Sequence, residues 1–341
     1  MSERQKRLLE IDALRGIAAL GVVFYHYTAH YGDHSQLLFS FPYGQYGVEL
    51  FFIISGFVIL MSLERSNKGL DFVINRLSRL YPAYWVAVIL TFLVLNFDTF
   101  PDNQVGWHVF LVNLTMLQTF FNVADLDGSY WTLGVELSFY IIMFTLHKTK
   151  LLKHLNKFIM VWLFLLLVAA LIKRFSIIDS TTVDSRIVTF FLLGRPHLTL
   201  YANVFIIGMM LYKAYRENFS KQKLLIIVCS LFIYDIQHTI QETFFLSLFI
   251  VMFYLILKRN VRFLTHRLLL FLGAISYSLY LIHQEIGFSI IRKSYELGMN
   301  PQLGVAVAVL VSIALASLIT FLIEQPSMRL IRESYKKKAN P

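Results

Sequence analysis

The sequence predicts an all-α membrane protein, a polytopic bundle of about ten transmembrane helices with both termini in the cytoplasm. Hydrophobic residues make up 57% of the 341 residues and charged residues only 15%, whereas soluble domains are ~45–50% apolar and ~25% charged. The mean hydropathy is +0.62, and long apolar runs recur along the whole chain. These observations predict one transmembrane domain over residues 1–341, in which 327–341 form a basic cytoplasmic tail.

Ten apolar runs approach the length that a helix needs to cross a bilayer, which is roughly 20 residues. Several of them are short or carry polar residues, so we expect neighbouring helices to shield those runs from lipid. The predicted spans are 11–29, 46–64, 80–97, 130–147, 158–172, 198–212, 224–237, 241–257, 267–286 and 303–323.

The segment 105–121 is ambiguous, because it suits either an eleventh span or an interfacial or re-entrant helix. The basic residues favour the second interpretation. With ten spans and a cytoplasmic N-terminus, all but six of the 31 Lys and Arg residues lie on the inner side, as the positive-inside rule requires. An eleventh span would destroy this pattern. The six residues on the outer side are Lys173, Arg174, Arg186, Arg195, Arg292 and Lys293.

The remaining composition narrows the classes of protein further. The net charge of +10 is explained by loop charges that set topology, so it does not indicate nucleic-acid binding. One cysteine, Cys229, allows no internal disulfide and no thiolate cluster, and no metal-site spacing occurs. The first run follows a basic stretch, as in a signal peptide. It carries Arg15 and His26 and shows no clear cleavage site, so we expect an uncleaved helix.

Ionisable residues inside the predicted spans are candidate functional positions, because charges are costly in a membrane. The predicted topology sorts them into two layers. The outer layer holds His26, Glu49, Glu136 and His283. The inner layer holds Asp12, Arg15, Arg76, Arg79 and Glu324.

The first span carries a member of each layer on one face. Arg15 and His26 are eleven residues apart, which is only ~20° beyond three helical turns and ~16 Å along the axis. A histidine at this depth can act as a general base or proton relay. The alternative is an interhelical hydrogen bond that only supports packing, and the spacing leaves both open.

Four other members of the two layers also have open roles. Arg76 and Arg79 are adjacent on a helix surface, and such a pair suits the phosphates of a nucleotide. By itself, however, the pair favours contact with lipid headgroups. Glu136 can orient a histidine, or it can pair with an outer arginine such as Arg186 or Arg195. His283 follows an aromatic run, and its simplest role is a hydrogen bond at a helix end.

Six short motifs stand in order between residues 12 and 326. The first includes Arg15 and His26, an arginine followed after ten residues by a histidine. The others are 47–57 (GVELFFIISGF), 76–82 (RLSRLYP), 131–140 (WTLGVELSFY), 276–283 (SYSLYLIH) and 324–326 (EQP). Together they resemble acyltransferase family 3, whose members are integral membrane O-acyltransferases of cell-surface carbohydrates. Thr132 stands where the family usually has serine and keeps the hydroxyl.

The resemblance implies an acyl-CoA donor, usually acetyl-CoA, and a hydroxyl acceptor on an outward-facing glycan or glycolipid. Because the chain stops soon after Glu324, with only a basic tail, we expect the stand-alone form of the family, without an added extracytoplasmic domain. The resemblance also implies the plasma membrane of a bacterium. It favours His26, Glu136 and Arg15 as catalytic residues, and Arg76, Arg79 and Arg15 as ligands of the donor. Further site positions in or beside the motifs are Glu49, Ser55, Tyr130, Trp131, His283 and Glu324.

A mechanism follows from these expectations. The cytoplasmic arginines would hold the phosphates of CoA, and His26 would deprotonate the acceptor hydroxyl for attack on the thioester. Glu136 would hold the tautomer of the imidazole. An acyl-histidine intermediate is the rival chemistry, and transfer of succinyl or another acyl group is the rival specificity. A proton-coupled transporter is the alternative from another class, because such carriers also use buried His, Glu and Arg.

Overall fold

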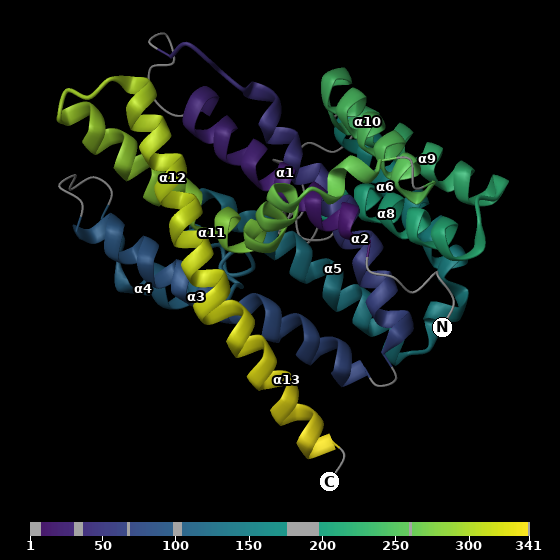
Figure 1. Ribbon diagram of the computed structural model, residues 1–341. Coiled ribbons are helices and arrows are strands. Elements are labelled where there is room, and N and C mark those ends of the chain that lie inside the picture. The colour runs from purple at the N-terminus through teal and green to yellow at the C-terminus, as the bar shows by residue number, and fades with distance from the viewer. Residues whose placement is uncertain are drawn as a thin grey trace, which may run out of the picture. The chain divides into compact units, whose positions relative to one another are not determined.

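The computed structural model describes residues 8–30, 37–66, 69–97, 104–175, 198–258 and 261–339. Every regular element within these ranges is a helix (Figure 1). The α-helices are α1 Leu9–Tyr25, α2 Gly47–Arg65, α3 Gly69–Phe97, α4 Trp107–Asn113, α5 Trp131–Lys148, α6 Leu155–Arg174, α8 Leu198–Glu217, α9 Lys221–Gln237, α10 Ile240–Leu257, α11 Arg267–Glu296, α12 Pro301–Ile319 and α13 Gln325–Ala339. Two π-helical turns, η2 His26–His30 and η9 Thr320–Glu324, follow α1 and α12 directly.

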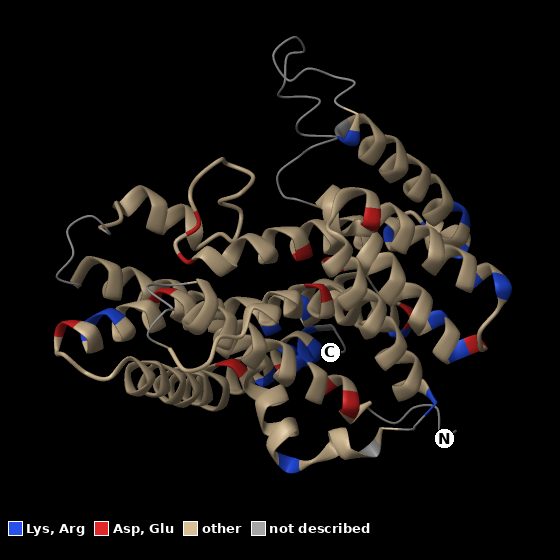
Figure 2. Cartoon of the chain, turned by 90° about the horizontal axis from the view of Figure 1, so that it is seen from above, with Lys and Arg blue, Asp and Glu red and all other residues tan. Residues whose placement is uncertain are grey.

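The predicted fold class, a polytopic helical membrane protein, is confirmed. Eight helices among the described residues are long and apolar enough to cross a membrane, and most of the helical length carries no Lys, Arg, Asp or Glu (Figure 2). Each of the ten predicted spans coincides with a helix. The helices α1 and α9 have 17 residues each, and α1 is extended by η2. The number of crossings and the side of the termini stay predictions.

The segment 105–121 contains only the short helix α4, of seven residues. At 1.5 Å per residue this helix is about 10 Å long, far less than the ~30 Å hydrocarbon core. Turns follow it, and Met116 there has a positive φ of 62°. This segment therefore does not form an eleventh transmembrane helix.

Helix starts follow from local sequence signals. The hydroxyl of Thr239 accepts a hydrogen bond from the backbone of Glu242, whose carboxylate accepts one from the backbone of Thr239, so a capping box begins α10. Asn300 caps α12, which has Pro301 in its first turn. Such caps satisfy backbone N–H groups that a helix end leaves without partners.

The chain divides into two compact units, each assembled from distant segments. Unit 1 comprises residues 1–8, 49–69 and 135–263, and unit 2 comprises 9–48, 70–134 and 264–341. The prediction of a single domain over 1–341 stays a prediction. The units are described separately below.

Small residues allow helix backbones to meet within each unit. In unit 2, α1 packs along α11, and α11 along α12. A side chain added at Gly16 or Gly273 would collide with the backbone of the facing helix. In unit 1, α2 meets α8 in the same way at Gly56 and Gly208. Close backbone approach at small residues is a common basis of helix association in membranes.

Candidate active site

The first site residue, His26, begins the π-helical turn η2 in unit 2. Such turns are rare and frequently occur at functional sites. The ring of His26 is half-buried and lies 4.9 Å from the ring of His283, centroid to centroid. His283 lies in the middle of α11 and is fully buried. The two histidines that sequence assigned to the outer layer on different spans are therefore in contact.

Hydrogen bonds define how the two rings are held. Nδ1 of His26 lies 2.9 Å from the carbonyl oxygen of Val22 and 3.1 Å from Nε2 of His283. Nδ1 of His283 lies 2.8 Å from the carbonyl oxygen of Tyr280. The hydroxyl of Tyr27 donates to the carbonyl oxygen of His283 at 2.6 Å. Neighbouring turns of η2 and α11 are thus joined at the histidine pair.

These contacts assign the tautomer of each neutral ring. A carbonyl oxygen only accepts hydrogen bonds, so Nδ1 carries the proton in both His26 and His283. Nε2 of His283 then has a lone pair, and it shares the single Nδ1–H of His26 with the carbonyl oxygen of Val22. Nε2 of His26 is left with its own lone pair. A nitrogen in this state can take a proton from a hydroxyl or attack an acyl carbon.

A buried aspartate that the sequence analysis did not single out supports this part of α11. Asp127 accepts hydrogen bonds from the backbone N–H and hydroxyl of Ser129, at 2.9 and 2.6 Å, and from the backbone N–H of Glu285, at 3.1 Å. Burial raises the pKa of Asp127 to about 6, against the opposing effect of these hydrogen bonds. Its only sequence signal is a capping pattern, Asp-Gly-Ser, before an apolar run.

The second part of unit 2 is a charged cluster around Glu324. Its carboxylate accepts a hydrogen bond from the hydroxyl of Ser278 at 3.0 Å, and the hydroxyl of Thr320 lies 3.4 Å away. The positive charges of Arg79 and Arg15 act on the same carboxylate. The structure therefore brings together three of the five residues that sequence placed in the inner layer.

Two further arginines extend this cluster. Arg76 is buried, with its guanidinium 5.7 Å from the ring centroid of Phe72. Arg332 of α13 lies close enough to Arg76 and Arg79 for mutual repulsion. It donates from Nε to the hydroxyl of Ser78 at 3.1 Å and from a terminal nitrogen to the carbonyl oxygen of Asn75 at 2.9 Å. Sequence reasoning missed Arg332, because it stands in a tail where basic residues are common.

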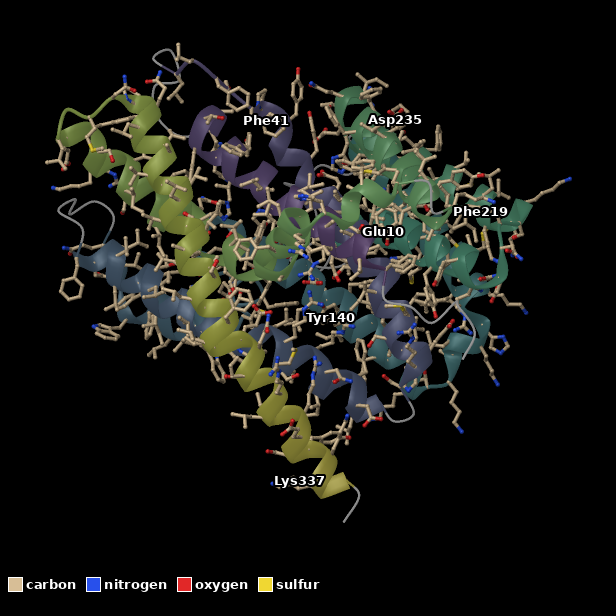
Figure 3. All side chains as sticks on the ribbon, in the orientation of Figure 1. Glu10, Phe41, Tyr140, Phe219, Asp235 and Lys337 are labelled. Atoms are coloured by element: carbon tan, nitrogen blue, oxygen red, sulfur yellow. The ribbon has the colours of Figure 1, made fainter. Side chains whose placement is uncertain are left out.

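Glu136 lies in unit 1, in the part of α5 that belongs to that unit. Its carboxylate oxygen accepts hydrogen bonds from the hydroxyl of Ser55 and, at 2.6 Å, from the hydroxyl of Tyr140, which Figure 3 labels. Two predicted site residues, Ser55 and Glu136, are therefore joined within one unit. Arg186 and Arg195, the alternative partners named for Glu136, lie outside the described residues.

Two other predicted positions, Glu49 and Tyr130, contact tyrosine side chains. Glu49 is buried in unit 1, where its carboxylate accepts a hydrogen bond from the hydroxyl of Tyr234 at 3.0 Å. Tyr130 is buried in unit 2, with its ring 5.2 Å from that of Tyr84. Trp131 begins α5 directly after Tyr130. The described residues contain no group of three or more His, Cys, Asp or Glu side chains that could hold a metal ion.

Comparison with protein families decides the identity of this helical bundle. A protein-family model described as an acyltransferase domain matches residues 8–321. The chain belongs to this acyltransferase family. The match includes His26, Glu136, His283 and the arginines of α1 and α3. It contains five of the six motifs, with 324–326 just beyond its end, and it confirms the resemblance to this family.

Three relatives of this acyltransferase-family chain have informative names. It is 32% identical over 159 residues to nodulation protein 10 of Rhizobium leguminosarum bv. viciae. The matched region covers 39% of the chain and 42% of that relative. It is 31% identical over 144 residues to an O-acetyl transferase of Shigella phage Sf6, covering 38% and 43%. It is 27% identical over 159 residues to the peptidoglycan O-acetyltransferase OatA of Listeria monocytogenes, covering 40% and 24%.

The matched regions thus span about two fifths of the length of the first two relatives and a quarter of the third. No solved structure matches the chain. The family is established by the match over most of the chain, and the activity is argued below from the site.

Proposed function

We propose that this chain is a membrane O-acyltransferase that moves an acetyl group from cytoplasmic acetyl-CoA to a hydroxyl of a cell-surface or lipid-linked carbohydrate. The family supports acyl transfer, and two of the relatives are named for O-acetyl transfer. The observation that carries the proposal is the histidine pair of unit 2, in which hydrogen bonds leave Nε2 of His26 with a lone pair. We further propose that the membrane is the plasma membrane of a bacterium.

The reaction begins with proton removal. Nε2 of His26 takes the proton of the acceptor hydroxyl as its oxygen attacks the thioester carbonyl of the donor. The tetrahedral intermediate collapses, the carbon–sulfur bond breaks, and the CoA sulfur receives the proton from the imidazolium of His26. The products are an ester and free CoA, so protons and electrons balance. His283 accepts the Nδ1–H of His26 throughout, which makes it a positioning residue.

This assignment changes one part of the expected mechanism. The sequence analysis gave the orienting role to Glu136. Within unit 2, however, the carbonyl of Val22 and Nε2 of His283 already engage Nδ1 of His26. We therefore give the orienting role to His283. Glu136, which accepts hydrogen bonds from Ser55 and Tyr140, stays a catalytic residue in the proposal, without an assigned partner in the reaction.

The charged cluster supplies the donor side of the proposal. CoA carries phosphates, and guanidinium groups bind phosphate through two parallel hydrogen bonds. Arg76, Arg79 and Arg15 are the predicted ligands. Arg15 and His26 both belong to the continuous helix formed by α1 and η2, ~16 Å apart by the helical rise. The extended arm of the donor would cover this length from the phosphates to the thioester.

Mass spectrometry of surface glycans tests the proposal. Cells that carry the gene should add about 42 Da per acetyl ester to a surface or lipid-linked glycan, and cells that lack it should not. His26→Ala should abolish the added mass without loss of the protein from the membrane. The matched control is His108→Ala, because His108 is exposed on α4. Normal product from His26→Ala would refute the role of His26.

A further inference from the structure

Unit 1 contains an open pocket that plays no part in the chemistry described above. It lies where α6 and α9 end and α10 begins, and its volume is about 770 Å³. This is within the range of ligand pockets, ~300–1,000 Å³. Asp235, which Figure 3 labels, lies at this end of α9. The predicted topology places these helix ends on the extracytoplasmic side, where the proposed acceptor would be.

Two exposed aromatic rings and two side chains of opposite charge line the pocket. Phe175 and Phe232 line it and are 68% and 60% exposed. The side chains of Arg174 and Asp235 line it too, and both residues are exposed. Exposed phenylalanine is also common where a membrane meets water, so the rings alone do not define a ligand. The polar atoms beside them do.

Three side chains that line the pocket, those of Gln237, Asp235 and Glu242, present hydrogen-bond acceptors. Oε1 of Gln237 is buried and has no hydrogen-bond partner among the described residues, so it needs a donor. Asp235 adds an exposed carboxylate. The carboxylate of Glu242 is partly used, because one oxygen accepts from the backbone and hydroxyl of Thr239 at 2.6 and 2.7 Å. Only ligand groups that donate hydrogen bonds can pair with these acceptor oxygens.

The side chain of His238, which lines the pocket, is held in place. The ring of His238 stacks on that of Tyr234, with centroids 3.9 Å apart and planes 6° from parallel. The hydroxyl of Tyr234 in turn donates to the buried carboxylate of Glu49 at 3.0 Å. Nδ1 of His238 lies 3.6 Å from the Glu242 carboxylate. A binding wall whose side chains are already fixed loses less entropy when a ligand binds.

The chemistry of these groups distinguishes ligand classes. A phosphate headgroup only accepts hydrogen bonds, and the carboxylates of Asp235 and Glu242 would repel it. An ammonium group only donates and gains nothing from Arg174. A sugar hydroxyl donates to a carboxylate or amide oxygen and accepts from a guanidinium, and the apolar face of a sugar ring can pack on phenylalanine. A polyhydroxylated ligand can therefore interact favourably with all of these groups.

We propose that this pocket binds the carbohydrate acceptor, so that unit 1 carries an acceptor-binding site while unit 2 carries the histidine pair and the arginines. Gln237 and Asp235 would accept hydrogen bonds from sugar hydroxyls, Arg174 would donate to them, and Phe232 would pack on the ring. This inference rests on the proposed function, since it names where the acceptor of that reaction is held.

The test is a transfer assay in membrane vesicles with radiolabelled acetyl-CoA. The acceptor is the surface-polysaccharide fraction extracted from cells of the source organism that lack the gene. Asp235→Asn and Phe232→Ala should each raise the half-saturating polysaccharide concentration about tenfold, which corresponds to about 1.4 kcal/mol. The half-saturating acetyl-CoA concentration should stay within twofold of that of the unaltered protein. Phe244→Ala is the matched control, because Phe244 is 63% exposed on α10 and does not line the pocket.

The outcomes separate this inference from the proposed function. If the unaltered protein transfers no label to polysaccharide, the proposed function fails, and with it the premise of the inference. If it transfers label and both variants keep the unaltered half-saturation for polysaccharide, the acceptor pocket alone is refuted. Equal losses for acetyl-CoA and polysaccharide would indicate a structural defect and would also refute it.

A second measurement tests the competing lipid ligand. Arg174→Gln keeps a donor to sugar hydroxyls but removes the cation. It should change polysaccharide half-saturation by less than threefold and leave the phospholipids that copurify with the protein unchanged. Loss of a copurifying anionic phospholipid, with unaltered polysaccharide half-saturation in the Asp235→Asn variant, would assign the pocket to lipid and overturn the proposal.

Discussion

The two ends of the first helix in unit 2 differ in kind. Where α1 continues into η2, His26 contacts a second imidazole, and carbonyl oxygens determine the direction of every hydrogen bond. At the other end, Arg15 and Arg79 act on a single carboxylate, that of Glu324. The first arrangement controls where one proton lies. The second leaves an excess of positive charge, because Arg76 and Arg332 lie in the same cluster.

The function of each end depends on a different property. A proton-transfer site depends on the position of one nitrogen and its tautomer, so it tolerates few substitutions. An anion site depends on the sum of several charges, so the loss of one is partly compensated. Substitutions at the histidine pair should therefore change turnover, and substitutions in the arginine cluster should change donor affinity.

Joint removal of Arg76 and Arg79 should weaken acetyl-CoA binding about a hundredfold. Loss of each guanidinium removes charge-assisted hydrogen bonds to the phosphates, and each such bond contributes ~1.5–3 kcal/mol. The turnover rate at saturating donor should fall far less. The measurement is the Kd for acetyl-CoA with protein in nanodiscs, compared with Lys336→Ala and Lys337→Ala, which remove two exposed charges from α13. An unchanged Kd for the arginine variant would exclude these residues as phosphate ligands.

Replacement of His283 by leucine should lower kcat by about ten- to fiftyfold. The variant removes the acceptor for Nδ1–H of His26, so the ring loses one of its two orienting contacts. His283→Gln should recover part of the rate, because its amide oxygen can accept the same hydrogen bond. KM for acetyl-CoA should change little in either variant. Equal activity of the leucine and glutamine variants would mean that His283 only fills space.

Replacement of Arg332 by glutamine should raise KM for acetyl-CoA about three- to fivefold. The side chain lies beside Arg76 and Arg79, yet it is half-buried and already bonded to Ser78 and Asn75. Its effect on a phosphate should therefore be mainly electrostatic, and it should shrink as salt rises. Titrations of donor at low and high salt measure this. A KM unaffected at low salt would place Arg332 outside the donor site.

Replacement of Asp127 by asparagine should have the smallest effect on turnover and act on stability instead. The pKa of Asp127 is raised to about 6 by burial, so the folded state holds its proton more tightly than the unfolded state does. Its contribution to stability is complete below about pH 4 and is lost as pH rises through about 6. Thermal unfolding in detergent should thus show a fall in Tm over this window that the asparagine variant lacks. If the Tm of the two proteins depends on pH in the same way, the raised pKa of Asp127 is contradicted.

The sequence predicted the helical class well, because that class depends on local patterns. Apolar runs locate helices, and the spacing of Arg15 and His26 places them on one helix. It did not predict that His26 and His283 touch, since residues 257 positions apart meet only through the packing of α1 on α11. Arg332 and Asp127 were missed for a related reason. Their roles come from partners on α3 and α11, which composition does not reveal.

The central claim is that His26 performs proton transfer while the arginine cluster holds the donor. The most direct measurement compares His26→Ala with the unaltered protein in two assays on one preparation, acetyl-CoA binding and single-turnover transfer to polysaccharide. We predict a Kd within about twofold and a transfer rate at least a hundredfold lower, as loss of a general base costs ~10²–10⁴. A His26→Ala protein that transfers acetyl groups at the unaltered rate would contradict the account.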